Sequence, residues 1–117
     1  MRMRPMKMIE AIIQPYKLEE VKQALNLIDV RGLTVTEVRG FGRQKGQRSQ
    51  YRGTVSNADL IPKLKLQLVV SDDRSDQAQE VISRAARTGK VGDGKIFVYS
   101  LNNVVRIRTG ERDDSAI

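Results

Sequence analysis

The chain has 117 residues with a hydrophobic fraction of 39% and a charged fraction of 30%, which is the size and composition of one globular domain. It contains no cysteine and no histidine, so disulfides, thiolate or imidazole metal sites, and cysteine or histidine catalysis are excluded. Its 21 basic and 14 acidic residues give a net charge of +7, which favours anionic partners such as nucleic acid, membrane surfaces, nucleotides or polycarboxylates.

The first part of the chain predicts a strand, an amphipathic helix and a second strand. Residues 6–13 alternate in polarity, and a helix follows in which apolar residues recur every three or four positions. Gly32 is expected to end this helix, and residues 33–38 are β-branched enough to predict a strand. No stretch approaches the roughly 18 apolar residues of a membrane span, and the short basic start lacks a signal peptide's apolar region, so we expect a cytoplasmic protein. The inward-facing positions are Ile9, Ala11 and Ile13 in the strand and Leu18, Val21, Leu25 and Ile28 in the helix.

The second part of the chain repeats this order. Residues 63–70 alternate and predict a strand, and a helix capped by Asp76 and stopped by Gly89 follows. Residues 96–99 predict a fourth strand and residues 104–108 a short fifth one. Two β-α-β units in succession favour an α+β ferredoxin-like sandwich, with residues 6–117 as a single domain after an N-terminal extension, residues 1–5. The inward-facing positions here are Leu64, Leu66, Leu68, Val70, Ala78, Val81, Ile82, Ala85 and Ala86.

A long loop, residues 41–59, separates the two units. It is basic up to Asp59, and its glycines would let the backbone approach a ligand closely, so its length and glycine content favour a functional loop over a solvated, flexible one. The RGFG sequence at 39–42 imitates an RNA-recognition signature, but an aromatic fraction of 4% leaves few platforms for base stacking. The basic residues in and beside the loop are Arg39, Arg43, Lys45, Arg48 and Arg52.

Residues 89–95, GKVGDGK, have the spacing of a phosphate-binding P-loop. Ile96 stands where that motif needs a Ser or Thr for magnesium, and the predicted order is helix, turn, strand, which is the reverse of a P-loop context. A P-loop NTPase is therefore rejected. Three glycines beside Lys95 nevertheless favour a nest for phosphate oxygens over a plain helix-to-strand turn.

Arg106 and Arg108 are two residues apart, so a strand over 104–108 would place both guanidinium groups on one face. Such a pair suits either the protection of an edge strand or the binding of a phosphate. The nearby glycine turn favours phosphate. No carboxylate is evident beside these turns, so we expect a binding protein and not an enzyme.

The chain resembles the PII nitrogen-regulatory signal proteins from Met6 to Ile117. The segments that carry the resemblance are residues 32–46, 51–53, 88–97 and 105–110, which read GLTVTEVRGFGRQKG, YRG, TGKVGDGKIF and VRIRTG. The family implies a compact homotrimer of ferredoxin-like subunits that binds ATP or ADP in three clefts between subunits. It also implies a protruding loop that contacts target proteins.

The resemblance implies specific roles for residues of this chain. A neighbouring subunit would supply Arg106 and Arg108, with Thr34 near the base of the site. Gln44 would hold Mg²⁺ together with the triphosphate and 2-oxoglutarate, and Lys63 would pair with the far carboxylate of 2-oxoglutarate. The implied nucleotide-binding residues are Thr34, Gly42, Arg43, Gln44, Val69, Gly92, Asp93, Gly94, Lys95, Arg106 and Arg108, and the implied 2-oxoglutarate-binding residues are Gly42, Gln44, Lys45, Gly46 and Lys63.

Three positions depart from the family pattern. Ser56 stands where many members carry a modifiable tyrosine, and Thr54 stands where some relatives carry a phosphorylated serine, so these two are the candidate modification positions. Gln67 replaces a glutamate that is usual near the adenine.

Targets implied by the resemblance are an ammonium channel, N-acetylglutamate kinase, and a nitrogen transcription regulator or its coactivator. Contact with a membrane would then be only indirect, through the channel. The alternative from the residues alone is a basic ferredoxin-like nucleic-acid-binding domain.

Overall fold

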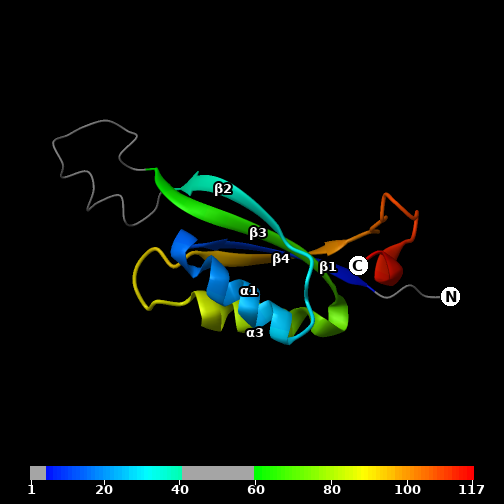
Figure 1. Cartoon of the computed structure of the whole chain (residues 1–117), viewed down its shortest axis with the longest axis horizontal. Helices are drawn as coiled ribbons and strands as arrows, with labels where there is room; N and C mark the ends of the chain where they lie inside the picture. Colours follow the sequence, from blue (N-terminus) through cyan, green and yellow to red (C-terminus); the bar gives the residue numbers. More distant parts are fainter. Residues whose placement is uncertain (1–4, 41–59) are drawn as a thin grey trace.

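The computed structural model describes residues 5–40 and 60–117, which form four strands and two α-helices (Figure 1). Short 3-10 turns, Pro15–Lys17 and Asp113–Ala116, precede the first helix and end the chain. In chain order the main elements are β1 (Met6–Ile13), α1 (Leu18–Leu27), β2 (Thr34–Gly40), β3 (Ile61–Ser71), α3 (Asp72–Ala86) and β4 (Lys95–Leu101).

The four strands form one antiparallel sheet in the order β2-β3-β1-β4. Both β-α-β connections therefore cross over a neighbouring strand, which is the arrangement of the ferredoxin-like sandwich and confirms the predicted fold class. The register pairs Met6 with Leu101 and Ile12 with Lys95, so β4 begins at the end of the sheet where β1 finishes.

Both helices cover the same face of the sheet and close one hydrophobic core (Figure 1). Side chains alternate between the two faces along β1 and β3, so the apolar residues at every second position point toward this core, as predicted. The helices contribute their apolar stripes, in which Val21 and Ile82 are fully buried. The core comprises Ile9, Ala11, Ile13, Val21, Leu25, Leu66, Leu68, Val70, Ala78, Ile82 and Ala86.

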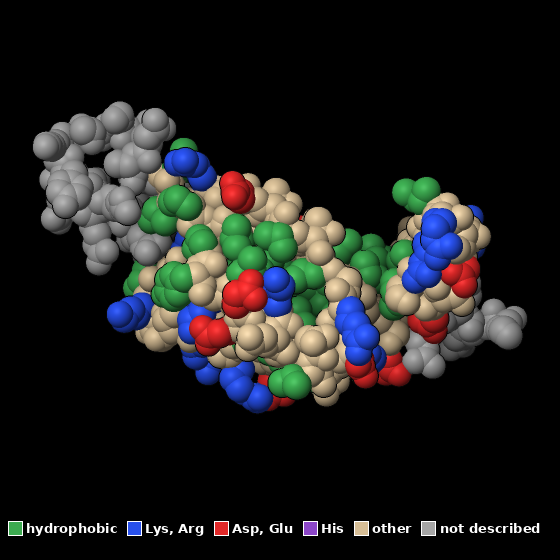
Figure 2. Space-filling view, in the orientation of Figure 1, with side chains coloured by type: hydrophobic (Ala, Val, Ile, Leu, Met, Phe, Trp, Pro, Cys, Tyr) green, Lys and Arg blue, Asp and Glu red, His purple; other side chains and the backbone are tan. Residues whose placement is uncertain are grey.

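The opposite face of the sheet has no covering layer among the described residues. Met8 and Val69 are half-buried there, and Phe97 and Tyr99 are 46% and 43% exposed. On the helix-covered side, Figure 2 shows further apolar side chains between β2 and α1. A groove of about 530 Å³ lies there and is lined by residues such as Leu18 and Val35. The open face mixes its apolar side chains with polar ones, among them Glu10 and Gln67. Large apolar side chains left exposed on a sheet are typical of a subunit that associates with another chain.

Three predicted helix boundaries are wrong, one of them the end of α3, which lies at Ala86 and not at Gly89. Asp76 does not cap α3, because the helix begins at Asp72, immediately after the extended Ser71 at the end of β3. Two aspartates in the first turn of α3 complement the positive end of the helix dipole, which favours this earlier start. The first helix ends at Leu27, five residues before Gly32, and Asp29 adopts the left-handed conformation, φ 63°, that reverses the chain.

The predicted fifth strand over 104–108 is also wrong. Its pairing is limited to an isolated bridge between Val105 and Arg112, because the chain turns back at once. The turn is closed by hydrogen bonds from the Gly110 N–H to the Arg106 carbonyl, 2.7 Å, and from the Arg106 N–H to the Glu111 carbonyl, 2.8 Å. Residues 102–112, which we call the C-terminal arm, therefore form a projecting turn and do not extend the sheet (Figure 1).

Candidate functional site

The glycine-rich turn between α3 and β4, residues 88–94, has a backbone that only glycine supports. Gly89, Gly92 and Gly94 have φ values of 86°, 104° and 97°. A Cβ atom on Gly94 would lie 1.8 Å from the Ile12 carbonyl oxygen, so the turn touches the end of β1 directly. The sequence-predicted nest for an anion is thus a closely packed turn fixed against the sheet.

Asp93 holds the two ends of this turn together. One carboxylate oxygen accepts hydrogen bonds from the backbone N–H groups of Thr88, 2.8 Å, and Gly89, 2.9 Å, and the other accepts one from the Thr88 hydroxyl. The Thr88 hydroxyl is the main cause of the lowering of the Asp93 pKa below its ordinary 3.8, with the two backbone N–H groups and Lys17 adding to it against desolvation. These contacts give Asp93 a structural role in the turn.

The Gly92 carbonyl receives two donors from the sheet. The Gln14 side-chain amide donates from the end of β1 at 3.0 Å, and the Lys63 ammonium donates from β3 at 2.5 Å. Lys63 is only 8% exposed, and this burial lowers the pKa of its ammonium below 10.5, while the Asp93 carboxylate opposes the lowering. A bound anion would stabilise such a buried ammonium group, because it offsets the cost of removing the charge from water.

Lys95 is the first residue of β4 and follows the turn directly. Its side chain is exposed, and it pairs across the sheet with Ile12, next to the closely packed Gly94. The structure therefore brings together five of the predicted site residues at one end of the sheet, which we call the glycine-turn end. They are Lys63, Gly92, Asp93, Gly94 and Lys95.

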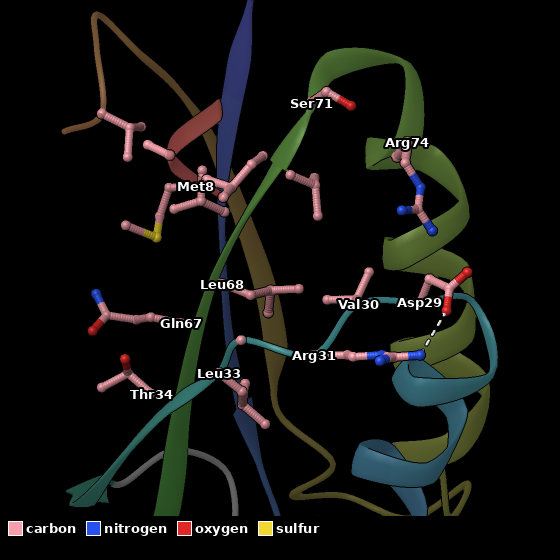
Figure 3. A pocket seen from close by; sticks show the side chains of 16 residues that line it. Met8, Asp29, Val30, Arg31, Leu33, Thr34, Gln67, Leu68, Ser71 and Arg74 are labelled. Atoms are coloured by element: carbon pink, nitrogen blue, oxygen red, sulfur yellow. Dashed lines mark hydrogen bonds and ion pairs between the residues drawn. The ribbon is translucent and has the colours of Figure 1, made fainter. Parts of the chain in front are cut away.

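A second group of predicted residues lines a pocket of about 550 Å³ farther along the sheet (Figure 3). Thr34 and Val69 both line this pocket, as does Gln67, which pairs with Thr34 across β2 and β3. In Figure 3 the side chains of Thr34, Gln67 and Met8 lie on one side of β3, and Leu33 and Leu68 lie on the helix side. The Gln67 amide donates a 3.0 Å hydrogen bond to Glu10.

The C-terminal arm lies at the same end of the molecule as this pocket, which Val104 and Ile117 help to line. Arg106 is half-buried and within 3.5 Å of the Glu111 carboxylate, whereas Arg108 is exposed. Between them Ile107 is 98% exposed, and basic side chains are conspicuous on the arm in Figure 2. The two arginines are thus available to an anion from a turn, not from the face of a strand.

The two groups are far apart within one chain. Leu101 lies six residue steps after Lys95 along β4, a distance of about 20 Å at 3.3 Å per residue, and Arg106 follows still farther along the chain. The arm and the glycine-turn end lie at opposite ends of the sheet (Figure 1). One chain by itself therefore does not bring its predicted phosphate ligands together.

Several predicted residues lie outside the described part of the chain. They are Gly42, Arg43, Gln44, Lys45, Gly46, Thr54 and Ser56. Within residues 5–40 and 60–117, no group of three or more acidic side chains could hold a metal ion, and no helix is long and apolar enough to cross a membrane.

Gln14 is the residue at the glycine-turn end that sequence reasoning missed. Nothing in its neighbourhood marks it, because it is a single polar residue between a strand and Pro15. Its contact with Gly92 spans 78 residues of sequence and is visible only in the folded chain.

Fold and geometry define a ferredoxin-like α+β domain with cationic groups gathered at two ends of its sheet. Residues 6–111 match the family model described as nitrogen regulatory protein P-II. The chain is 54% identical to a nitrogen regulatory protein P-II of Pasteurella multocida and 52% identical to the nitrogen regulatory protein GlnK of Escherichia coli K12. Each alignment spans 112 residues, 96% of this chain and all of the relative.

A solved structure agrees with these matches. The crystal structure of Arabidopsis thaliana PII bound to citrate superimposes with a TM-score of 0.81 at 37% identity, covering 97% of this chain and 94% of that one. The chain belongs to the nitrogen regulatory protein P-II family and is a nitrogen regulatory signalling protein. The resemblance drawn from its sequence motifs is confirmed.

Proposed function

We propose that this protein senses the energy and carbon state of the cell by binding ATP or ADP and, with Mg-ATP, 2-oxoglutarate. One observation carries the proposal: the predicted phosphate ligands divide between the glycine-turn end and the C-terminal arm, about 20 Å or more apart. A site that uses both groups needs two copies of the chain. The nucleotide would therefore bind between subunits, with Lys95 from one and Arg106 and Arg108 from its neighbour.

The open face of the sheet supports a homotrimer with such sites. Half-buried Met8 and Val69 and exposed Phe97 and Tyr99 lie where a second copy would cover them. Burial of apolar surface stabilises by roughly 25 cal/mol per Å² before the entropic cost of association, so covering these side chains would favour an interface on this face. Closed cyclic symmetry would then repeat the same intersubunit site at every interface.

The two ends of the sheet would bind different parts of the nucleotide. The pocket that contains Thr34 and Val69 is large enough for an adenine ring, and it lies on the same end of the chain as the arginines of the arm. The phosphates would meet the glycine turn of the neighbouring copy, where Gly92, Gly94 and Lys95 are gathered. Gly42 and Arg43 would complete the site from the loop. Asp93 supports it by closing the turn.

Lys63 is the proposed partner of the far carboxylate of 2-oxoglutarate. Its burial beside the turn makes an added carboxylate favourable, and a relative in the family has been crystallised with citrate, a tricarboxylate. Magnesium prefers oxygen ligands, and the described residues offer no cluster of three acidic side chains. Gln44, the triphosphate and 2-oxoglutarate would hold it, with Lys45 and Gly46 beside the dicarboxylate.

The output of the sensor would be regulation of target proteins through residues 41–59. The proposed targets are those of the family resemblance: an ammonium channel, N-acetylglutamate kinase, or a nitrogen transcription regulator or its coactivator. Thr54 and Ser56 are the proposed modification positions in this segment. We assign no catalytic residues, and we expect the protein to act in the cytoplasm, where its proposed effectors are metabolised.

Calorimetry tests the linkage between the two effectors. We expect 2-oxoglutarate to bind when Mg-ATP is present and not when ADP replaces it, because the dicarboxylate site includes the magnesium and the triphosphate. Gln44→Ala should abolish the response to 2-oxoglutarate while leaving nucleotide binding through Lys95, Arg106 and Arg108. Equal 2-oxoglutarate affinity with ATP and ADP would refute the mechanism.

Mixed oligomers test whether the site lies between subunits. Lys95→Gln and Arg108→Gln chains should each bind ATP weakly alone. When the two are unfolded, mixed in equal amounts and refolded, about a quarter of the interfaces should regain an intact site, because one chain supplies Lys95 and the other Arg108. Failure to recover any tight sites in oligomers shown to be mixed would contradict the intersubunit location.

The nucleic-acid alternative makes an opposite prediction. A basic nucleic-acid binder would shift oligonucleotides at micromolar protein, with an affinity that falls steeply as the salt concentration rises. We expect no such shift, because the proposed anion sites accept nucleotides and small carboxylates. A tight, salt-dependent complex would favour the alternative.

A further inference from the structure

The Gly92 carbonyl is held by two side chains of different chemistry. Gln14, which immediately follows β1, reaches it with a neutral amide donor at 3.0 Å, and Lys63 reaches it from β3 with a cationic donor at 2.5 Å. A carbonyl oxygen has two lone pairs, so both bonds form at once. The glycine turn is therefore tied to two neighbouring strands through a single atom.

The Gln14 contact starts from a well-fixed position. Gln14 follows the buried Ile13, its own backbone is extended, and Pro15 immediately after it begins a 3-10 turn. The side chain is half-buried, so the loss of its bond would leave a sheltered amide and a carbonyl with one donor fewer. Close packing of Gly94 on Ile12 lies next to it, on the same strand end.

The two contacts differ in charge, so an anionic ligand would affect the Lys63 contact more than the Gln14 contact. An ammonium group is drawn toward an added carboxylate, and the proposed function gives Lys63 such a partner. A neutral amide experiences no comparable attraction. If Lys63 turned toward an anion, its hydrogen bond to the Gly92 carbonyl would weaken, whereas the bond from Gln14 would remain.

We infer that Gln14 is a positioning residue for the phosphate-binding turn, which it keeps in place through the Gly92 carbonyl when Lys63 is engaged by a dicarboxylate. The role of the turn in binding phosphate rests on the proposed function. The hydrogen bond by which Gln14 holds the turn does not depend on that function. The hydrogen bond of Gln14 is to the Gly92 carbonyl, so Gln14 would act through the backbone of residues 88–94.

Hydrogen exchange of the ligand-free protein tests the hold directly. The reporters are the backbone N–H groups of the turn at Thr88, Gly89 and Lys90, each of which donates to a side chain within it. Gln14→Leu removes the donor with little change in volume, and Gln14→Lys restores a donor. Gln77→Leu makes the same change on the exposed side of α3 and is the matched control.

We expect Gln14→Leu to accelerate exchange in the turn by about fivefold, equivalent to about 1 kcal/mol at 1.4 kcal/mol per factor of ten. In a Lys63→Met background, where Gln14 is the remaining holder, the acceleration should be several times larger. Gln14→Lys should restore the slow rate, and Gln77→Leu should not change it. A merely structural effect would give the same factor in both backgrounds and would overturn the inference, as would no acceleration at all.

Nucleotide binding provides the second readout. Gln14→Leu should weaken ADP binding about fivefold in calorimetry, and Gln14→Lys should recover it. If exchange in the turn responds as expected but the wild-type protein binds neither ATP nor ADP, the proposed function fails and the hold by Gln14 stands. If ADP binds but exchange and affinity are unchanged in Gln14→Leu, the inference about Gln14 fails and the proposed function stands.

Discussion

Gly94→Ala should be more destabilising than Gly89→Ala in the same glycine turn. The new Cβ atom would lie 1.8 Å from the Ile12 carbonyl oxygen, about 1.6 Å closer than the 3.4 Å at which ordinary contact begins. The obstacle is backbone in an inner strand of the sheet, which no side-chain rotation relieves. Gly89→Ala is the matched control, because Gly89 has a similar positive φ and a Cβ added there would meet no atom within 4 Å.

The expected magnitudes follow from these two contributions. A positive φ at a non-glycine residue costs about 1–2 kcal/mol, which applies to both variants. Overpacking against a fixed neighbour adds about 1–3 kcal/mol, which applies to Gly94→Ala alone. For a chain of this length, 1 kcal/mol lowers Tm by about 4 °C, so we expect decreases of about 4–8 °C for Gly89→Ala and about 8–20 °C for Gly94→Ala.

Thermal unfolding followed by circular dichroism, at one fixed protomer concentration, measures this difference. ATP affinity of the folded variants gives a second readout, because displacing Gly94 also displaces Lys95. Equal decreases in Tm for the two glycine variants would refute the close approach of the turn to β1. The inference that this turn is fixed against the sheet would then fail with it.

Three further predictions concern the core, the turn and the phosphate site. Ile82→Ala should lower the free energy of unfolding by about 2–5 kcal/mol, because Ile82 is fully buried, whereas Leu27→Ala, at an 86% exposed position, should change it by less than about 0.5 kcal/mol in chemical denaturation. The pKa of Asp93 is lowered in the folded protein, so its contribution to stability is present above the ordinary value of 3.8 and is lost as pH falls through the folded pKa. Asp93→Asn should therefore be less stable than wild type at pH 7. Chemical denaturation at a series of pH values should show that this difference in stability narrows in acid. Lys95→Gln should weaken ATP binding by about tenfold or more in calorimetry, because a charge-assisted hydrogen bond to phosphate is worth about 1.5–3 kcal/mol, and an unchanged affinity would remove Lys95 from the site.

Periodic segments were predictable because their patterns report burial directly. Residues 6–13 alternate in sequence, and β1 buries Ile9, Ala11 and Ile13 on the core side. The same reasoning located β3 and the inner stripe of α3. Boundaries were harder to predict. Several residues can cap the start of α3, namely Ser71, Asp72, Asp73 and Asp76, and the actual start is set by where β3 ends.

The 104–108 segment shows where local pattern fails. Its alternating valine, arginine and isoleucine residues have the composition of a strand, yet a strand needs a partner along its length. The chain turns back between Arg106 and Gly110, so pairing stops after a single bridge. A turn therefore presents the arginine pair. The hydrogen bonds that close this turn are not predictable from the local sequence pattern.

Local patterns in the chain predict the fold class and the family, since periodicity, glycine spacing and charge are properties of residues near one another in the chain. Which of those residues meet depends on how the strands pair in the folded chain. The fold joined Gln14 and Lys63 to Gly92 across 78 and 29 residues of chain, and it sent Arg106 to the opposite end of the sheet from Lys95. Strand geometry explains both placements: each residue of β4 advances the chain by about 3.3 Å, while the antiparallel register returns the end of β1 and the start of β3 to the same edge.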